Sequence, residues 1–76
     1  MTTLSSCPRG CHTIVKKLHT QGSLKQRLIS LGIMKGAQIT LLEYAPAKST
    51  IEIKVGKMRL ALRKEEADTI EVEMPQ

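Results

Sequence analysis

The stretch RLISLGIMKG, residues 27–36, decides the fold because it contains the end of a helix and the turn that follows it. Leu24, Leu28 and Leu31 recur at i, i+4 and i+7, which places them on one apolar face of a helix. Gly32 follows directly, and a glycine there can adopt the left-handed conformation that ends a helix. The pattern therefore predicts a short helix that packs one face on a core and stops at residue 32.

Residues before this stretch and at its end set the limits of the helix. Ser23 is expected to be the N-cap, because its hydroxyl can accept a hydrogen bond from a free backbone N–H of the first turn. Ile33 is the apolar residue that commonly accompanies a glycine at a helix end. Lys35 and Gly36 then make a turn into the next element.

Five segments around this helix have the composition of short strands. The clearest are 50–55 and 58–63, where apolar and polar residues alternate around the two-residue turn Gly56-Lys57, so that Ile53 lies opposite Leu60. Closure into a barrel would remove the exposed edges of such short strands. The sequence therefore predicts a mainly β fold, a small SH3-like barrel of about five strands with one short helix after the first strand. The other strands are expected at 11–18, 37–44 and 70–73, with one helical turn at 64–69.

The length of the chain allows one thin core. A domain of 76 residues buries only about 60% of the surface that its unfolded chain exposes. We expect a single domain over residues 1–76, with residues 1–10 as a loosely ordered N-terminal segment. Apolar runs are two or three residues long, and the first ten residues lack the apolar core of a signal peptide. The chain is therefore expected to be cytoplasmic and not inserted in a membrane.

The charge of the chain is distributed unevenly. All 12 Lys and Arg residues lie within residues 1–64, together with only two of the seven acidic residues. A basic body attracts acidic protein surfaces, anionic lipid or nucleic acid, although a solvated surface is the simpler interpretation. With one Tyr and no Phe or Trp, the chain lacks the aromatic side chains on which single-stranded nucleic acids usually stack. A basic nucleic-acid-binding barrel is therefore the less favoured alternative.

The residues capable of chemistry do not form a catalytic pattern. Neither His12 nor His19 has an acidic neighbour in sequence, and no phosphate-binding loop is present. The sequence therefore predicts a protein that is not an enzyme and requires no cofactor.

Cys7, Cys11 and His12 are the candidate metal ligands. Thiolate and imidazole groups bind zinc or iron, but the spacing C-x₃-C-H is followed by no second ligand pair. Weak transition-metal binding is one interpretation of these residues. Two ordinary thiols in a terminal segment is the simpler one.

The outer side of the predicted helix and the turn after it carry an unusual pair of apolar residues. Ile29 and Met34 stand where a solvated surface would be polar, and Arg27 and Lys35 lie beside them. Exposed apolar residues that are surrounded by basic residues are typical of a docking patch. We predict that Arg27, Ile29, Met34 and Lys35 bind a partner, with incidental exposure as an equally weighted alternative.

The chain resembles the FeoA family, small cytosolic partners of the FeoB ferrous-iron transporter. Arg27-Leu28, Leu31-Gly32-Ile33 and Gly36 follow the family pattern R-L-x-x-L-G-[IM]-x-x-G. Further matches are Ala45-Pro46, residues 60–63 (LALR), residues 65–67 (EEA) and residues 70–73 (IEVE), so that the resemblance covers about residues 10–74.

This resemblance implies an SH3-like barrel without catalytic activity. It implies a role in ferrous-iron uptake through contact with the cytosolic GTPase region of FeoB, at the inner face of the membrane, by a monomer or weak oligomer. The pattern does not include Cys7, Cys11 and His12, so it leaves a metal-binding regulatory barrel as an alternative.

Overall fold

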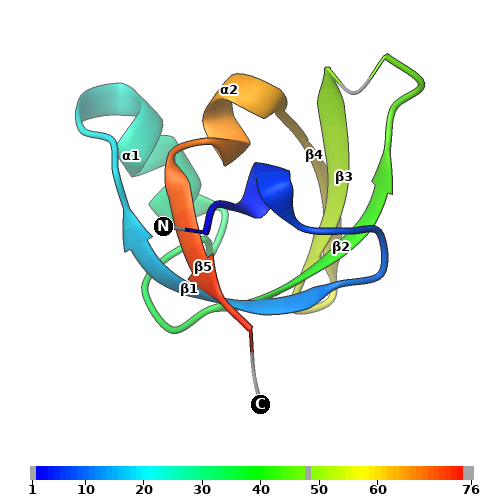
Figure 1. Ribbon diagram of the computed structural model, residues 1–76. Coiled ribbons are helices and arrows are strands. Elements are labelled where there is room, and N and C mark those ends of the chain that lie inside the picture. Colours follow the sequence, from blue (N-terminus) through cyan, green and yellow to red (C-terminus); the bar gives the residue numbers. More distant parts are fainter. Residues whose placement is uncertain (1, 48, 75–76) are drawn as a thin grey trace.

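A computed structural model of the protein describes residues 2–47 and 49–74. Five antiparallel strands form one sheet in the order β4-β3-β2-β1-β5. The sheet curls around a common core, and α2 lies between the ends of β4 and β5 (Figure 1). The elements are η1 (Leu4–Ser6), β1 (His12–Leu18), α1 (Gly22–Ser30), β2 (Gln38–Tyr44), β3 (Thr50–Val55), β4 (Met58–Arg63), α2 (Lys64–Ala67) and β5 (Ile70–Glu73).

The β3–β4 hairpin has the bounds and the register that the alternating pattern predicted. Ile53 pairs with Leu60, and Val55 with Met58 at the turn. Gly56 has φ +61°, the left-handed value that a two-residue hairpin turn requires at its first position. Ile53 is fully buried, whereas Leu60 is half-buried.

The C-terminal end of α1 also follows the prediction. The Gly32 N–H donates to the carbonyl of Ile29, and the Ile33 N–H donates to the carbonyl of Leu28, both at 2.9 Å. These are the two hydrogen bonds of a Schellman motif, and Gly32 supplies the φ of +89° that the motif needs. Leu28 and Ile33 are fully buried, so the helix end is attached to the core.

The expected N-cap of α1 is wrong. The helix begins at Gly22, its N-cap residue is Gln21, and no side chain caps the first turn. Ser23 therefore lies inside the helix. Attachment of the helix comes from its buried side: Leu28 is fully buried, and Leu24 and Leu31 pack against the core from half-buried positions.

The N-terminal segment is the main departure from the sequence-based expectation. Residues 1–10 were expected to be loosely ordered, but Leu4 and Cys7 are buried in the core. The Thr2 carbonyl accepts a hydrogen bond from the Val72 N–H at 2.8 Å, which joins the segment to β5. The Tyr44 hydroxyl donates to the carbonyl of Ser5 at 3.1 Å and contacts the carbonyl of Cys7. Within residues 2–10, therefore, the segment completes the barrel.

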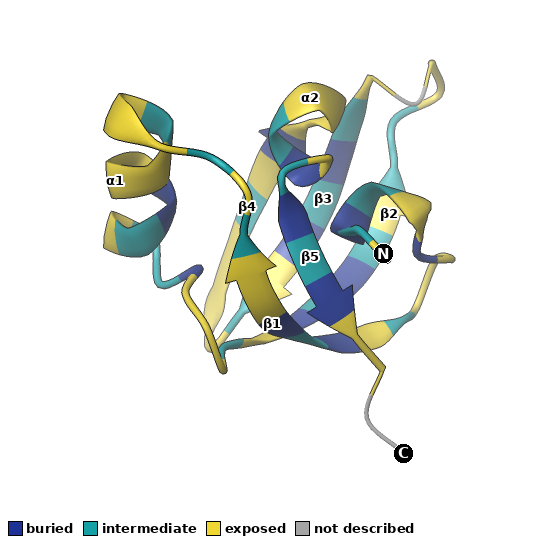
Figure 2. Ribbon diagram, turned by 60° about the vertical axis from the view of Figure 1, so that its left-hand side comes forward, coloured by how far each residue is buried: buried dark blue, intermediate teal, exposed yellow. Residues whose placement is uncertain are grey.

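The core occupies the space enclosed by the curled sheet and is closed by short elements. Figure 2 shows the buried residues on the inner side of the strands, while most of α1 is exposed. Thr13 is the buried polar residue of the described part, and its hydroxyl donates to the Ile39 carbonyl at 3.2 Å. Because that hydroxyl is hydrogen-bonded, its burial does not leave an unpaired polar group. The largest buried side chains are Leu4, Leu28, Ile33, Ile39, Leu41, Ile51, Ile53, Leu62 and Ile70.

A lysine-rimmed groove as the candidate functional site

A groove of about 500 Å³ lies between the end of β1, the outer side of α1 and the turn that follows α1. We call it the α1–β1 groove. Three apolar side chains and four lysines line it: Leu18, Ile29 and Met34, with Lys16, Lys17, Lys25 and Lys35.

The apolar lining of the α1–β1 groove is only partly covered by the protein itself. Leu18 and Ile29 are half-buried, and 44% of Met34 is exposed. Leu18 packs against the core, so the groove begins where the core ends. Apolar area that the fold leaves in contact with water is available for burial by another molecule.

The charge of the α1–β1 groove is positive. Lys16 has one carboxylate partner, since its Nζ lies 3.6 Å from Oε2 of Glu71. Within the described ranges, Lys17, Lys25 and Lys35 form no ion pair. No carboxylate lines the described groove, so the positive charge of these three lysines is not balanced locally.

Backbone hydrogen bonds hold the turn after α1 against β1. The Gly36 N–H donates to the Val15 carbonyl at 2.8 Å, and the Val15 N–H donates to the Ala37 carbonyl at 2.9 Å. Gly36 has φ +89°, a conformation that other residues adopt only with strain. These contacts fix Met34 and Lys35 beside the end of β1, so the groove is a built part of the fold.

The sequence comparisons identify the family of the chain. The family model described as the FeoA domain matches residues 2–74. The chain belongs to the FeoA family. Among curated relatives, an Fe(2+) transport protein A of Helicobacter pylori is 38% identical over 56 residues, which are 74% of each chain. An Fe(2+) transport protein A/FeoB fusion protein of Porphyromonas gingivalis is 27% identical over 71 residues, which are 93% of this FeoA chain and 8% of the fusion.

Solved structures of the FeoA family share the fold of this chain. The iron(II) transport protein A of Clostridium thermocellum superposes with a TM-score of 0.92 at 36% identity, and the match covers 96% of this chain and 45% of the other. This chain thus spans less than half the length of that protein. The FeoA of Stenotrophomonas maltophilia, described as an SH3 domain protein and solved with zinc, superposes with a TM-score of 0.83 at 28% identity over 96% and 91% of the two chains.

The family and the fold confirm two predictions from the sequence. The chain is a FeoA protein, a family linked to ferrous-iron transport, and its fold is a small SH3-like barrel with five strands. Among residues 2–47 and 49–74 there is no helix with the length and apolar character needed to cross a bilayer.

The structure brings three of the four predicted partner-binding residues of this FeoA protein together. Ile29, Met34 and Lys35 all line the α1–β1 groove. Arg27 does not, because its Nη1 lies 2.5 Å from Oε2 of Glu66 on α2, on another side of the helix. A contact between Arg27 and a partner stays a prediction.

The residues that β1 contributes to the groove were not predicted from the sequence. Lys16, Lys17 and Leu18 precede α1 by only a few residues, but their approach to Met34 depends on how the turn folds back. The adjacent pair Lys16-Lys17 was the feature of the sequence that could have indicated this contribution, since it interrupts the alternation of apolar and polar residues in β1. A bulge between Val15 and Lys17 accompanies this interruption.

The structure does not gather the three predicted metal ligands. Cys7 is buried, and its pKa is raised to about 12 by burial and then by the neighbouring Cys11 thiol. Cys11 is half-buried, with its Sγ 3.1 Å from Sδ of Met74, and the His12 Nδ1 lies 3.0 Å from Oγ1 of Thr40. In the described part of the chain, no three His, Cys, Asp or Glu side chains form a cluster that fits a metal ion.

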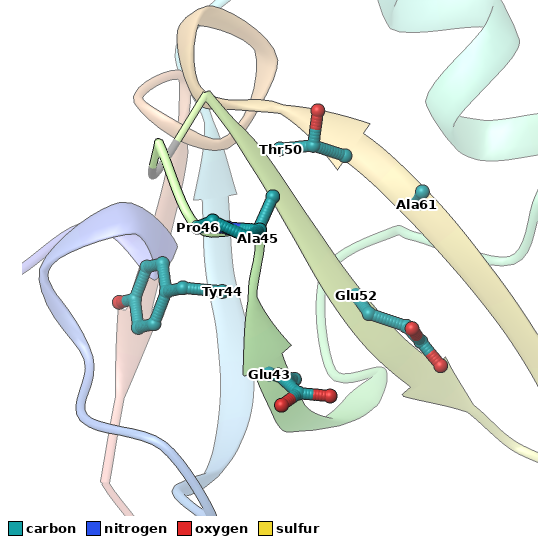
Figure 3. Close-up of a pocket in the computed structure, with 7 residues that line it drawn as sticks. All are labelled: Glu43, Tyr44, Ala45, Pro46, Thr50, Glu52 and Ala61. Atoms are coloured by element: carbon teal, nitrogen blue, oxygen red, sulfur yellow. The ribbon is translucent and has the colours of Figure 1, made fainter.

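A second hollow lies on the outer side of β2 and β3. Figure 3 shows Glu43 and Glu52 on neighbouring strands, while the Tyr44 ring points away from both carboxylates. Glu43 and Glu52 are directly paired across the two strands, and Arg59 binds the Glu52 carboxylate. Arg59 thus offsets the repulsion that like charges produce when they face each other across a sheet. A carboxylate of this hollow is therefore paired within the protein, whereas Lys17, Lys25 and Lys35 of the groove have no ion-pair partner in the described chain.

Proposed function

We propose that this FeoA protein is a non-catalytic accessory module of ferrous-iron uptake that binds the cytosolic GTPase region of FeoB and supports or regulates the transporter. The observation that carries this proposal is the α1–β1 groove, in which Ile29 and Met34 stay partly in contact with water beside four lysines. The fusion of the two proteins in Porphyromonas gingivalis supports FeoB as the partner.

The position of the groove also supports a binding role. Ile29 lies on α1, and Met34 lies in the turn whose backbone is hydrogen-bonded to β1 through Gly36. A few side chains contribute most of the binding energy of a protein interface, and Ile29 and Met34 are the candidates in this groove. Such a module acts in the cytoplasm, at the inner face of the membrane, because that is where the GTPase region of FeoB lies.

The direct test is a pull-down of the FeoB cytosolic region from the same organism, loaded with GDP or with GTP. Ile29→Asp and Met34→Asp are each expected to weaken the capture by about tenfold or more, because a buried unpaired carboxylate opposes docking. The same variants are expected to lower ferrous-iron uptake in cells that lack the native protein.

Met74→Asp is the matched control for Met34→Asp. Both methionines are 44% exposed, but Met74 follows β5 and contacts Cys11 instead of the groove. The control is expected to bind FeoB like the unmodified protein. Full capture and full uptake in both groove variants would contradict the proposed site, and no capture of FeoB by the unmodified protein would contradict the proposed partner.

Metal binding by the N-terminal thiols is the second candidate function. The complex of the Stenotrophomonas maltophilia FeoA with zinc favours it, and Cys7 and Cys11 lie close enough to interact, although the described residues place no third ligand beside them. Calorimetry with Fe²⁺ and Zn²⁺ under reducing conditions tests the proposal, and a Cys7→Ser/Cys11→Ser double variant is expected to lose the binding. An unchanged affinity in that variant, or in His12→Ala, would remove the corresponding residues from the ligand set.

A further inference from the structure

We infer that the α1–β1 groove binds an acidic amphipathic segment of its protein partner, with apolar side chains against Leu18, Ile29 and Met34 and carboxylates against the lysines. This inference rests on the proposed function for the identity of the partner. The kind of segment that binds is inferred from the residues that line the groove.

The apolar part of the groove requires apolar side chains on the segment. Leu18, Ile29 and Met34 come from β1, α1 and the following turn, and none of the three is fully covered. An amphipathic segment can fill a groove with anchors on one face while its other face stays in water. Met34 also suits this use, because its unbranched thioether side chain adapts to different partners.

The charged part of the groove requires acidic side chains on the segment. Lys17, Lys25 and Lys35 surround the apolar lining without an ion-pair partner in the described chain. Glu71, which pairs with Lys17 across β1 and β5, already binds Lys16 and His19. The chain therefore supplies positive charge from β1, from α1 and from the turn after α1, and the complementary negative charge would come from the partner.

The same features oppose nucleic acid and lipid as the occupant. No aromatic side chain lines the groove, so bases have no surface on which to stack. A phosphate backbone would meet the lysines but leave the lining of Leu18, Ile29 and Met34 exposed. A membrane surface offers both anionic headgroups and acyl chains, but it is broad, whereas a protein segment is narrow enough to lie in a groove between β1 and α1.

Two synthetic helical peptides test the inference on the full chain. Both carry Leu at i, i+3, i+4 and i+7, and their remaining positions are Glu in one peptide and Lys in the other. We expect the acidic peptide to bind at least tenfold more tightly, with an affinity that falls between 50 and 300 mM salt. Amide shifts in an NMR titration are expected at Leu18, Ile29 and Met34.

A pair of charge reversals supplies the matched comparison. Lys25→Glu/Lys35→Glu is expected to weaken binding of the acidic peptide at least tenfold and to favour the basic one. Lys54→Glu/Lys57→Glu makes the same change of net charge on the β3–β4 hairpin, where neither lysine lines the groove, and is expected to change the affinity less than threefold.

Several results would overturn the inference. Equal affinity for the two peptides, equal losses in the two charge-reversal variants, or shifts confined to another face would do so. Preferential binding of phosphatidylglycerol vesicles or of a DNA duplex over the acidic peptide would do so as well. If the protein captures FeoB but not the acidic peptide, this inference fails and the proposed function stands. If it binds the peptide in the groove but not FeoB, the proposed function fails instead.

Discussion

The two ends of β1 are completed in different ways. The N-terminal segment, which leads into the His12 end, runs along β5 and covers the barrel: Leu4 and Cys7 are buried, and the Tyr44 hydroxyl holds the backbone of the segment. At the Leu18 end, no comparable segment of the described chain covers the strand, and the α1–β1 groove stays open. The chain that precedes β1 is thus packed into a closed core, whereas the chain that follows β1 leaves apolar and cationic side chains exposed.

This difference separates residues that stabilise the fold from residues that are free to bind. Apolar side chains at the closed end lose almost all contact with water, so their substitution is expected to change the free energy of unfolding. Met34 at the open end is 44% exposed, so its substitution is expected to change binding instead of stability.

Leu4→Ala is expected to have the largest effect on stability, because it removes a fully buried side chain from the closed end. The expected loss is about 2–5 kcal/mol in the free energy of unfolding, measured by urea denaturation. Met34→Ala, at the open end, should stay within about 0.5 kcal/mol of the unmodified protein. A loss below about 1 kcal/mol for Leu4→Ala would mean that the N-terminal segment contributes little to the core.

Gly32→Ala is expected to have the next largest effect and to act on the open end. An added Cβ would meet Val55 Cγ1 at an ordinary 3.5 Å, so the strain would come from the φ of +89°. A left-handed conformation costs about 1–2 kcal/mol for a residue with a side chain. Thermal denaturation should show this loss, and Gly32→Asn should show less of it because asparagine tolerates the conformation. Equal losses would point to crowding instead of backbone strain.

Tyr44→Phe removes the hydroxyl that holds the closed end while keeping the ring. The hydroxyl donates to the Ser5 carbonyl and also contacts the Cys7 carbonyl. The expected loss is about 0.5–1.5 kcal/mol, together with faster amide hydrogen exchange in the N-terminal segment. Exchange at Met34 and Lys35 should not change, and a uniform increase over the whole chain would contradict a local role.

Cys7 is expected to make the stability of the protein depend on pH in alkali. Burial and the neighbouring Cys11 raise its pKa from 9.0 to about 12, so the folded state retains the thiol proton more strongly than the unfolded state does. The resulting stability is fully present below pH 9.0 and is lost as the pH rises toward 12. Cys7→Ala should therefore flatten the decline of stability over this range relative to its value at pH 8.

Alkylation with iodoacetamide separates the two thiols. Cys11 is half-buried and should react first in the native protein, whereas the buried Cys7 should react slowly. In urea, both thiols should react at similar rates. Rapid reaction of both thiols in the native state would contradict the closed end described above.

Local patterns made much of the fold predictable. The β3–β4 hairpin follows from strict alternation around Gly56, and the end of α1 follows from Leu28, Gly32 and Ile33. The packed N-terminal segment could not be predicted in the same way. Leu4 and Cys7 are separated by two serines and show no periodicity, so their burial depends on contacts with distant residues such as Tyr44.

The candidate site was predictable only where its residues are close in sequence. Ile29, Met34 and Lys35 belong to one helix and its turn, so their exposure could be read from the pattern. The contribution of β1 to the groove could be recognised only in the folded structure. The same holds for His19, whose carboxylate partner Glu71 is 52 positions away and lies 2.5 Å from its Nε2.

The pairing of β5 with β1 has a consequence for tethered forms of this domain. Ile14 pairs with Glu73, and Leu18 pairs with Ile70, so the last described residues leave the sheet at the opposite end of β1 from the groove. A linker attached there would leave the groove unobstructed. A transporter joined through such a linker would meet the groove at a high effective concentration, so that even a weak contact could be occupied most of the time.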